Sequence, residues 1–257
     1  ELMKEGGYES VFIGTGAGLP SFMNIPGENY IGVCSANEYL TRINLMKAYL
    51  PEYDTPIMHG DKIAIVGGGN VAMDAARCAK RMGASEVYII YRRSLAELPA
   101  RAEEVHHAME EGIIFKLLNN PVQILGDETG HVRAIECVEM ELGEPDASGR
   151  RKPIPVEGKT ETLAIDTMIL AIGQAVDASI FDCDKTRKNA IAYDPETFMT
   201  SMPGVFAGGD CGNDKISIAV EAIADARKAS DVIDAYLAGE EVKYEKPYVV
   251  ERDDITE

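Results

Sequence analysis

The sequence has 257 residues, of which 46% are hydrophobic and 26% are charged, so it is long enough for one large or two modest globular domains. Its formal net charge of −18 at pH 7 argues against nucleic acid and anionic membranes as partners, because both repel an acidic surface. No apolar run is long enough to cross a membrane and the chain does not start with a signal peptide, so no transmembrane helix is expected.

The first predicted element is a buried strand at residues 10–14, which leads into the glycine turn Gly14-Thr15-Gly16-Ala17-Gly18. Because the chain reaches this strand almost at once and has no initiator methionine, we expect it to be a fragment. A short helix is predicted over residues 35–48, with Ser35 as its N-cap. Two prolines and a glycine indicate a linker at residues 51–60.

A strand, a helix and a second strand are predicted next, at residues 62–66, 70–82 and 86–91. Gly83 ends the helix. Its predicted buried face, at helical spacing, holds Val71, Ala75, Cys78, Ala79 and Met82.

The order of the remaining elements predicts an α/β fold. A helix at residues 99–111 is followed by β-like runs at 113–118, 122–125, 132–142 and 162–172, with a polar turn at 146–152. A strand at 205–207 and a helix from about 217 to 238 complete the series. We interpret this order as a Rossmann-like FAD/NAD(P)-binding fold. In that fold a β-meander replaces one crossover helix of the parallel sheet, and a partial second dinucleotide-binding domain follows.

The strongest motif has the form GxGxxA and comprises Gly67, Gly68, Gly69, Asn70, Val71 and Ala72. It follows a predicted strand and opens a predicted helix, which is the context that a dinucleotide fingerprint requires. Gly67 permits the tight turn, Gly69 lets the backbone approach a pyrophosphate, and Ala72 lets the helix pack close to the strand. The amide groups at the helix start then face the phosphates. The alternative is a glycine turn without a ligand.

The end of the second strand distinguishes the two nicotinamide dinucleotides. An NAD site places an acid there, but Glu86 begins the strand and is expected at the opposite end of the sheet. The strand ends instead in Arg92 and Arg93, whose guanidinium groups can bind a 2′-phosphate, and Arg101 can join them from the next loop. The sequence therefore predicts NADP(H). Solvated surface arginines are the alternative.

A second signal lies at residues 205–210, where an apolar strand ends in Gly208, Gly209 and Asp210 before a helix rich in small residues. Flavoproteins with two dinucleotide-binding domains place an aspartate in this way against the ribityl chain of FAD. A common glycine turn is the alternative. These motifs involve no pattern of nucleophile, metal or redox disulfide, and no catalytic residue is predicted.

The cysteines and histidines show no spacing of a chemical site. No two cysteines form a C-x-x-C pair, so reduced, buried thiols of a cytoplasmic protein are expected. The histidines, His59, His106, His107 and His131, have no metal-ligand spacing, and no metal is expected.

The chain resembles the C-terminal two-thirds of the glutamate synthase (NADPH) small-subunit family, whose members are NADPH-dependent FAD oxidoreductases. The resemblance rests on residues 12–17, 31–33, 36–40, 67–74, 91–93, 98–101, 170–174, 204–210 and 221–223. It implies that Gly14, Thr15 and Gly16 lie near both nucleotides, with Gly173 and Gln174 in a further shared motif. Asn213, Asp214 and Lys215 depart from the small residues usual in the family.

The family's layout implies three segments: an FAD-domain remnant at residues 1–55, an NADP(H)-binding domain at 56–175, and a second FAD-domain remnant at 176–257. In the family, a first FAD-binding βαβ unit and, in many members, an iron–sulfur region precede the part that this sequence matches. FAD binding by the chain alone therefore stays open.

The resemblance implies that NADPH passes hydride to FAD and that electrons leave for a partner subunit, either the large glutamate synthase subunit or a ferredoxin-type protein. Three alternatives remain: a subunit of a ferredoxin–NADP(H) oxidoreductase or sulfide dehydrogenase, an NADP(H)-binding fragment without turnover, and a dehydrogenase acting directly on a small substrate. The last lacks a proton-relay residue beside the motif. A homodimer is neither predicted nor excluded.

Overall fold

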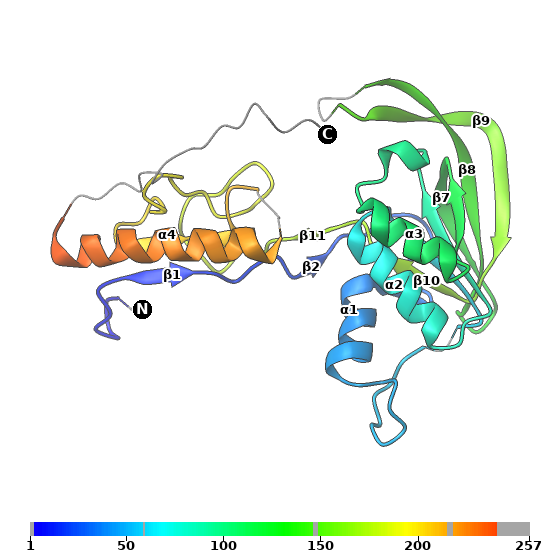
Figure 1. Ribbon diagram of the computed structural model, residues 1–257, viewed down its shortest axis with the longest axis horizontal. Helices are drawn as coiled ribbons and strands as arrows, with labels where there is room; N and C mark the ends of the chain where they lie inside the picture. The colour runs from blue at the N-terminus through cyan, green and yellow to red at the C-terminus, as the bar shows by residue number, and fades with distance from the viewer. Residues whose placement is uncertain (1–2, 59, 146–148, 215–217, 241–257) are drawn as a thin grey trace. The chain divides into compact units, whose positions relative to one another are not determined.

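The computed structural model describes residues 3–58, 60–145, 149–214 and 218–240 (Figure 1). The chain forms two compact units. One unit is Pro20–Gly173, and the other combines the described residues up to Leu19 with those from Gln174 onward. No helix within these described residues is long and apolar enough to cross a membrane.

The unit Pro20–Gly173 is built on a five-stranded parallel sheet in the order β3-β10-β4-β5-β6. The strands are β3 (Val33–Ser35), β10 (Thr167–Leu170), β4 (Lys62–Val66), β5 (Glu86–Tyr91) and β6 (Ile114–Leu117). The three inner strands, β10, β4 and β5, are buried almost along their whole length, which is typical of a parallel sheet covered on both faces.

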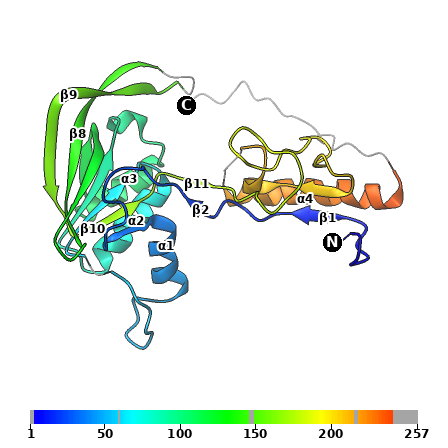
Figure 2. The same ribbon diagram turned by 180° about the vertical axis from the view of Figure 1, so that it is seen from behind.

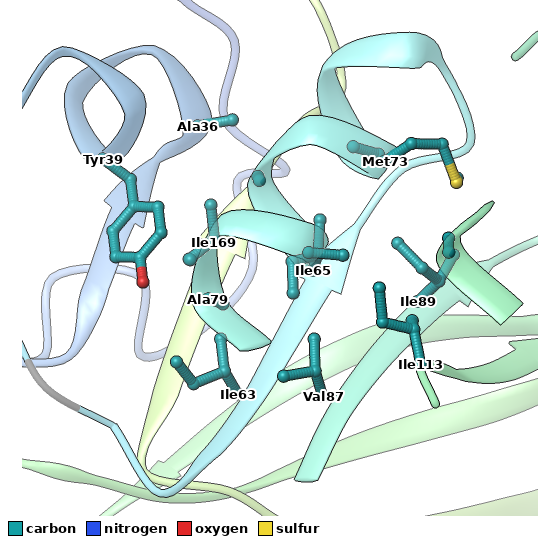
Figure 3. Close-up of a cluster of buried hydrophobic side chains, with 14 of the residues drawn as sticks. Ala36, Tyr39, Ile63, Ile65, Met73, Ala79, Val87, Ile89, Ile113 and Ile169 are labelled. Carbon is teal, nitrogen blue, oxygen red and sulfur yellow. The ribbon is translucent and has the colours of Figure 1, made fainter. Parts of the chain in front are cut away.

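The two faces of the sheet are covered by different layers, as Figure 1 and Figure 2 show. Helices α1 (Ala36–Leu40), α2 (Asn70–Arg81) and α3 (Ala102–Glu110) pack on the face that holds Ile63 and Ile65 of β4 (Figure 3). The opposite face, with Ala64 and Val66, packs against an antiparallel meander. Its strands are β7 (Asn119–Gly126), β8 (Val132–Pro145) and β9 (Arg151–Ala164). Successive side chains of β4 point to opposite faces of the sheet, so the strand contributes to two hydrophobic cores.

Helix α2 contacts its surroundings mainly through alanines. Its buried positions are Ala72, Met73, Ala75, Ala76 and Ala79, and the four alanines let the helix approach the sheet and α1 closely. The prediction that Val71 belongs to the buried face was wrong, because this side chain is 50% exposed at the start of the helix. Cys78 and Met82 are only partly buried.

The predicted N-cap of the first helix is confirmed, since the Ser35 hydroxyl accepts a hydrogen bond from the Glu38 amide at 3.1 Å. The α-helix is shorter than predicted. It ends at Leu40, and the chain continues as a π-helical turn, η1 (Thr41–Leu45). The predicted helix at 99–111 begins later, after a 3₁₀ turn η2 (Leu95–Glu97). The predicted strand at 162–172 is divided between the end of β9 and β10.

The second unit contains a two-stranded parallel sheet, β1 (Val11–Ile13) with β12 (Val205–Ala207), and the long helix α4 (Ala219–Ala238). Phe206 of β12 is fully buried and packs against Ala229 and Val232 of α4. The short strands β2 (Leu19–Pro20) and β11 (Gln174–Ala175) form a further two-stranded sheet.

The predicted α/β class, the parallel sheet and the β-meander are thus present. The division of the chain differs from the boundary predicted at residue 55, because β3 pairs with β10 and α1 packs on α2. Residues 20–55 therefore belong with the central sheet and not with β1 and β12.

Candidate nucleotide site

Two of the three consecutive glycines after β4 are required by the fold itself. Gly67 has a φ of +144°, and a Cβ added to it would lie 2.3 Å from the carbonyl oxygen of Ala171. A Cβ on Gly68 would lie 2.7 Å from the Tyr91 ring. Gly67 is therefore required by its backbone conformation and by packing, and a side chain at Gly68 would have to displace Tyr91 and Leu98.

Gly69 is different, because no protein contact explains it. Its φ is −88°, which any residue can adopt, and an added Cβ would meet no described atom within 4 Å. Gly69 is the N-cap of α2 and offers no side chain to the first amide groups of the helix. The space in front of this helix start therefore fits a group that approaches the backbone closely and bonds to its amides, as a pyrophosphate does.

The loop after β5 is fastened to the glycine turn. The Asn70 side-chain oxygen accepts a hydrogen bond from the Arg101 amide at 2.9 Å, and the Gly68 carbonyl accepts one from the Ala100 amide at 3.1 Å. The Asn70 side chain thus links the glycine turn to the loop after β5. Ala72 is fully buried. Arg101 is exposed next to the turn, as a residue that contacts a nucleotide would be.

The two arginines at the end of β5 are not equivalent, contrary to the sequence-based interpretation. Arg92 is exposed. Arg93 is only 5% exposed, and its Nε donates a hydrogen bond of 2.7 Å to the carbonyl oxygen of Arg151. The guanidinium group of Arg93 is thus held inside the protein by the start of β9. Of the two arginines, Arg92 is therefore the one whose side chain is exposed to solvent.

Glu86 lies at the opposite end of β5, as predicted. It pairs with Lys62 in register and receives an ion pair of 3.1 Å from that residue's Nζ. The hydrogen bond from the Tyr88 hydroxyl lowers the pKa of Glu86, as does the bond from Lys62. No acid of this strand therefore stands at the ribose position of an NAD site.

Sequence reasoning missed an arginine from β9 that reaches this loop. Arg151 Nε donates to Glu97 Oε1 at 2.5 Å, and Glu97 also accepts hydrogen bonds from the hydroxyl and the amide of Ser94. The Ser94 hydroxyl and then Arg151 hold the pKa of Glu97 below its usual range. The only signal in the sequence was a pair of arginines, Arg150 and Arg151, in a predicted polar turn of an acidic chain.

A second group of predicted residues meets in the other unit. Parallel pairing sets Ile13 beside Ala207, so the segment Gly14-Thr15-Gly16 and the segment Gly208-Gly209-Asp210 leave the same edge of the β1–β12 sheet. Gly16 and Gly209 have φ values of +68° and +70°. The Gly209 amide lies 3.4 Å from an Asp225 carboxylate oxygen.

Two of the residues that depart from the family in the next loop are bonded within this unit. Asn213 accepts a hydrogen bond from the Tyr193 amide at 3.1 Å and donates one to the Tyr193 carbonyl at 3.0 Å. Asp214 accepts a hydrogen bond from Thr186. Their side chains therefore support the loop, and Lys215 lies outside the described residues.

Gly173 and Gln174 stand at the division between the units. Gly173 has a φ of +110°, and its carbonyl accepts a hydrogen bond from the Ser21 amide at 3.1 Å. Gln174 begins β11. The predicted site residues thus form two groups, one at the glycine turn of the larger unit and one at the strand ends of the other.

The part of the chain that the structure describes contains no candidate metal site and no disulfide. Its His, Cys, Asp and Glu side chains form no group able to hold a metal ion, and His59 lies outside that part. All five cysteines are free thiols. Burial raises the pKa of Cys34 and of Cys137 to about 12, so these two remain protonated at neutral pH.

The parallel sheet, the β-meander and the glycine turn define a Rossmann-like α/β protein of the FAD/NAD(P)-binding class. Residues 3–226 match the family described as pyridine nucleotide-disulphide oxidoreductase, and the chain belongs to this family. FprA of Mycobacterium tuberculosis in complex with NADPH has the same fold. Its TM-score is 0.73 at 17% sequence identity, over 90% of this chain and 64% of that one.

The chain is similar to subunits of larger enzymes. It is 45% identical to the NADP(+)-dependent formate dehydrogenase subunit beta of Moorella thermoacetica, over 90% of this chain and 32% of the relative. It is 34% identical to the glutamate synthase [NADPH] small chain of Halomonas elongata, over 92% of this chain and 51% of the relative. The predicted resemblance is thus confirmed, although the chain spans about half of that small chain and a third of the first relative.

Proposed function

We propose that the chain is the NADP(H)-binding module of a flavin-dependent oxidoreductase that supplies reducing equivalents to a partner subunit. The observation that carries this proposal is the open space at Gly69, the residue before the α2 amides, where no described protein atom requires a glycine. The exposed Arg92 at the end of the neighbouring strand supports the choice of NADP(H) over NAD(H).

Each group of site residues would have its own ligand. The α2 amides bind the pyrophosphate, and Arg92 with Arg101 binds the adenosine 2′-phosphate. Gly14, Thr15, Gly16, Gly209 and Asp210 contribute to an FAD site, where the two segments leave one sheet edge together. Bound together, NADPH and FAD supply hydride-transfer chemistry, for which the protein contributes alignment and needs no nucleophile.

The partner is an electron-accepting subunit. The relatives' names as a beta subunit and a small chain support this arrangement. A glutamate synthase large subunit is one candidate, as the sequence resemblance implies. The formate dehydrogenase relative, with its higher identity, favours a second candidate, a subunit that exchanges electrons with an NADP(+)-dependent dehydrogenase. The five free thiols support a reducing, cytoplasmic location.

Calorimetric titration of the protein with NADPH and with NADH tests the nucleotide site. We expect NADPH to bind at least about tenfold more tightly, because only it offers a 2′-phosphate to charge-assisted bonds. Equal affinities would contradict the selectivity, and no binding would contradict the site. Reduction of a dye by NADPH after addition of FAD then separates an oxidoreductase from a binding module, which gives no turnover.

A further inference from the structure

The start of β9 is held against the loop after β5 by both its main chain and its side chain. Arg151 lies 57 residues after Ser94, yet its Nη2 is 3.4 Å from the Ser94 hydroxyl and its Nε is 2.5 Å from a Glu97 oxygen. Its carbonyl oxygen also accepts the hydrogen bond from Arg93. These contacts place a third guanidinium group beside the segment that carries Arg92.

We propose that Arg151 is a specificity-determining residue for the adenosine 2′-phosphate of NADP(H), which rests on the function proposed above. Glu97 is 8% exposed, whereas the Arg151 side chain is 48% exposed. The buried carboxylate orients the guanidinium group from the protein side, and the rest of the side chain faces solvent. A guanidinium group has five N–H donors, so the bonds to Glu97 and Ser94 do not exhaust its capacity.

The charge of the ligand explains why a further arginine would strengthen this site. A phosphate monoester carries nearly two negative charges at neutral pH, and the protein as a whole is strongly acidic. Arg93 is buried, so Arg92 and Arg101 would have to overcome the repulsion without its help. Because Glu97 fixes Arg151 before the ligand arrives, little side-chain entropy is lost on binding.

The test uses two small probes that differ only in the group in question, adenosine 2′,5′-bisphosphate and adenosine 5′-monophosphate. In Arg151→Ala we expect the Kd of the bisphosphate to rise about tenfold or more and that of the monophosphate to change less than about twofold. Arg133→Ala is the matched control, because Arg133 is also an exposed arginine paired with an acid, Asp127. This control should change neither Kd.

A second variant covers the case in which the loss of the Glu97 partner disturbs the loop. Arg151→Lys keeps a positive charge beside Glu97 but lacks the planar guanidinium group that can form two parallel hydrogen bonds. We therefore expect a partial loss of affinity for the bisphosphate and no loss for the monophosphate. Unchanged selectivity in both variants, or an equal loss for both probes, would overturn the assignment and leave the proposed function intact. A wild-type protein that binds neither probe would overturn both.

Discussion

Substitution of Gly69 by alanine separates the demands of the fold from those of the ligand. The added Cβ meets no described protein atom, and the φ of −88° suits alanine. Alanine has fewer backbone conformations than glycine in the unfolded chain, which stabilises the folded protein by about 0.4–1 kcal/mol. Alanine is also a poorer N-cap than glycine, which costs up to about 1 kcal/mol. The two effects offset each other, so the thermal midpoint should change little.

Binding of NADPH should nevertheless fall in Gly69→Ala. The methyl group occupies the space through which a pyrophosphate approaches the α2 amides, and at least one hydrogen bond to a charged group is lost or lengthened. Such a bond contributes about 1.5–3 kcal/mol, which corresponds to roughly a 10- to 150-fold rise in Kd. NADH should lose as much as NADPH, because both dinucleotides share the pyrophosphate.

Two other glycines serve as controls, with calorimetry and thermal unfolding as the measurements. Gly18 also has an ordinary φ and open space, so Gly18→Ala should leave both stability and affinity unchanged. Gly67→Ala should destabilise the protein, because its Cβ would clash with the Ala171 carbonyl at a φ of +144°. If Gly69→Ala bound NADPH as tightly as the wild type, the argument that this position admits a ligand would be refuted.

Three further predictions concern charge, pH and the core. Arg92→Ala should weaken NADPH about tenfold or more and NADH hardly at all, measured by calorimetry, whereas adding Arg93→Ala should also lower the thermal midpoint because that side chain is buried. The lowered pKa of Glu97 stabilises the folded protein above the ordinary value of 4.5, and this stability is lost as pH falls through the folded-state pKa. As pH falls from 4.5 through the folded-state pKa, the free energy of unfolding measured in denaturant should therefore fall less in Glu97→Gln than in the wild type. Ile65→Ala should cost about 2–5 kcal/mol in the same assay, because Ile65 is fully buried.

The glycine turn and its flanking strands were predictable because they depend on local pattern. β4 and β5 are short, continuous apolar runs, which are typical of strands buried on both faces, and both ends of each agree with the structure. The different burial of Arg92 and Arg93 was not recognised, since the sequence does not show which residue of the segment a distant strand will cover. That covering strand, β9, meets Arg93 through a residue 58 positions away.

The pairing of β3 with β10 was missed for the same reason of distance. Val33 lies beside Met168 in the sheet, although the glycine motif and the whole meander separate them in the sequence. A parallel pair has no tight turn to signal it, and family layout suggested a boundary at residue 55 instead. Residues 20–55 therefore join the central sheet through contacts that no local pattern records.

Strand β9 was difficult to predict because it contributes little to the core, and this property bears on its role. No residue of the described strand Arg151–Ala164 is buried, whereas β8 buries four of its side chains. An exposed edge strand rich in charge and proline resists pairing with other chains, which explains its composition but not its fixed start. Besides its ladder with β8 and the ion pair of Glu161 with Lys116, the strand is anchored at its start by the contacts of Arg151 with the loop after β5. A strand that adds little apolar burial yet is anchored at this point is better explained by the position of its arginine than by the stability of the meander.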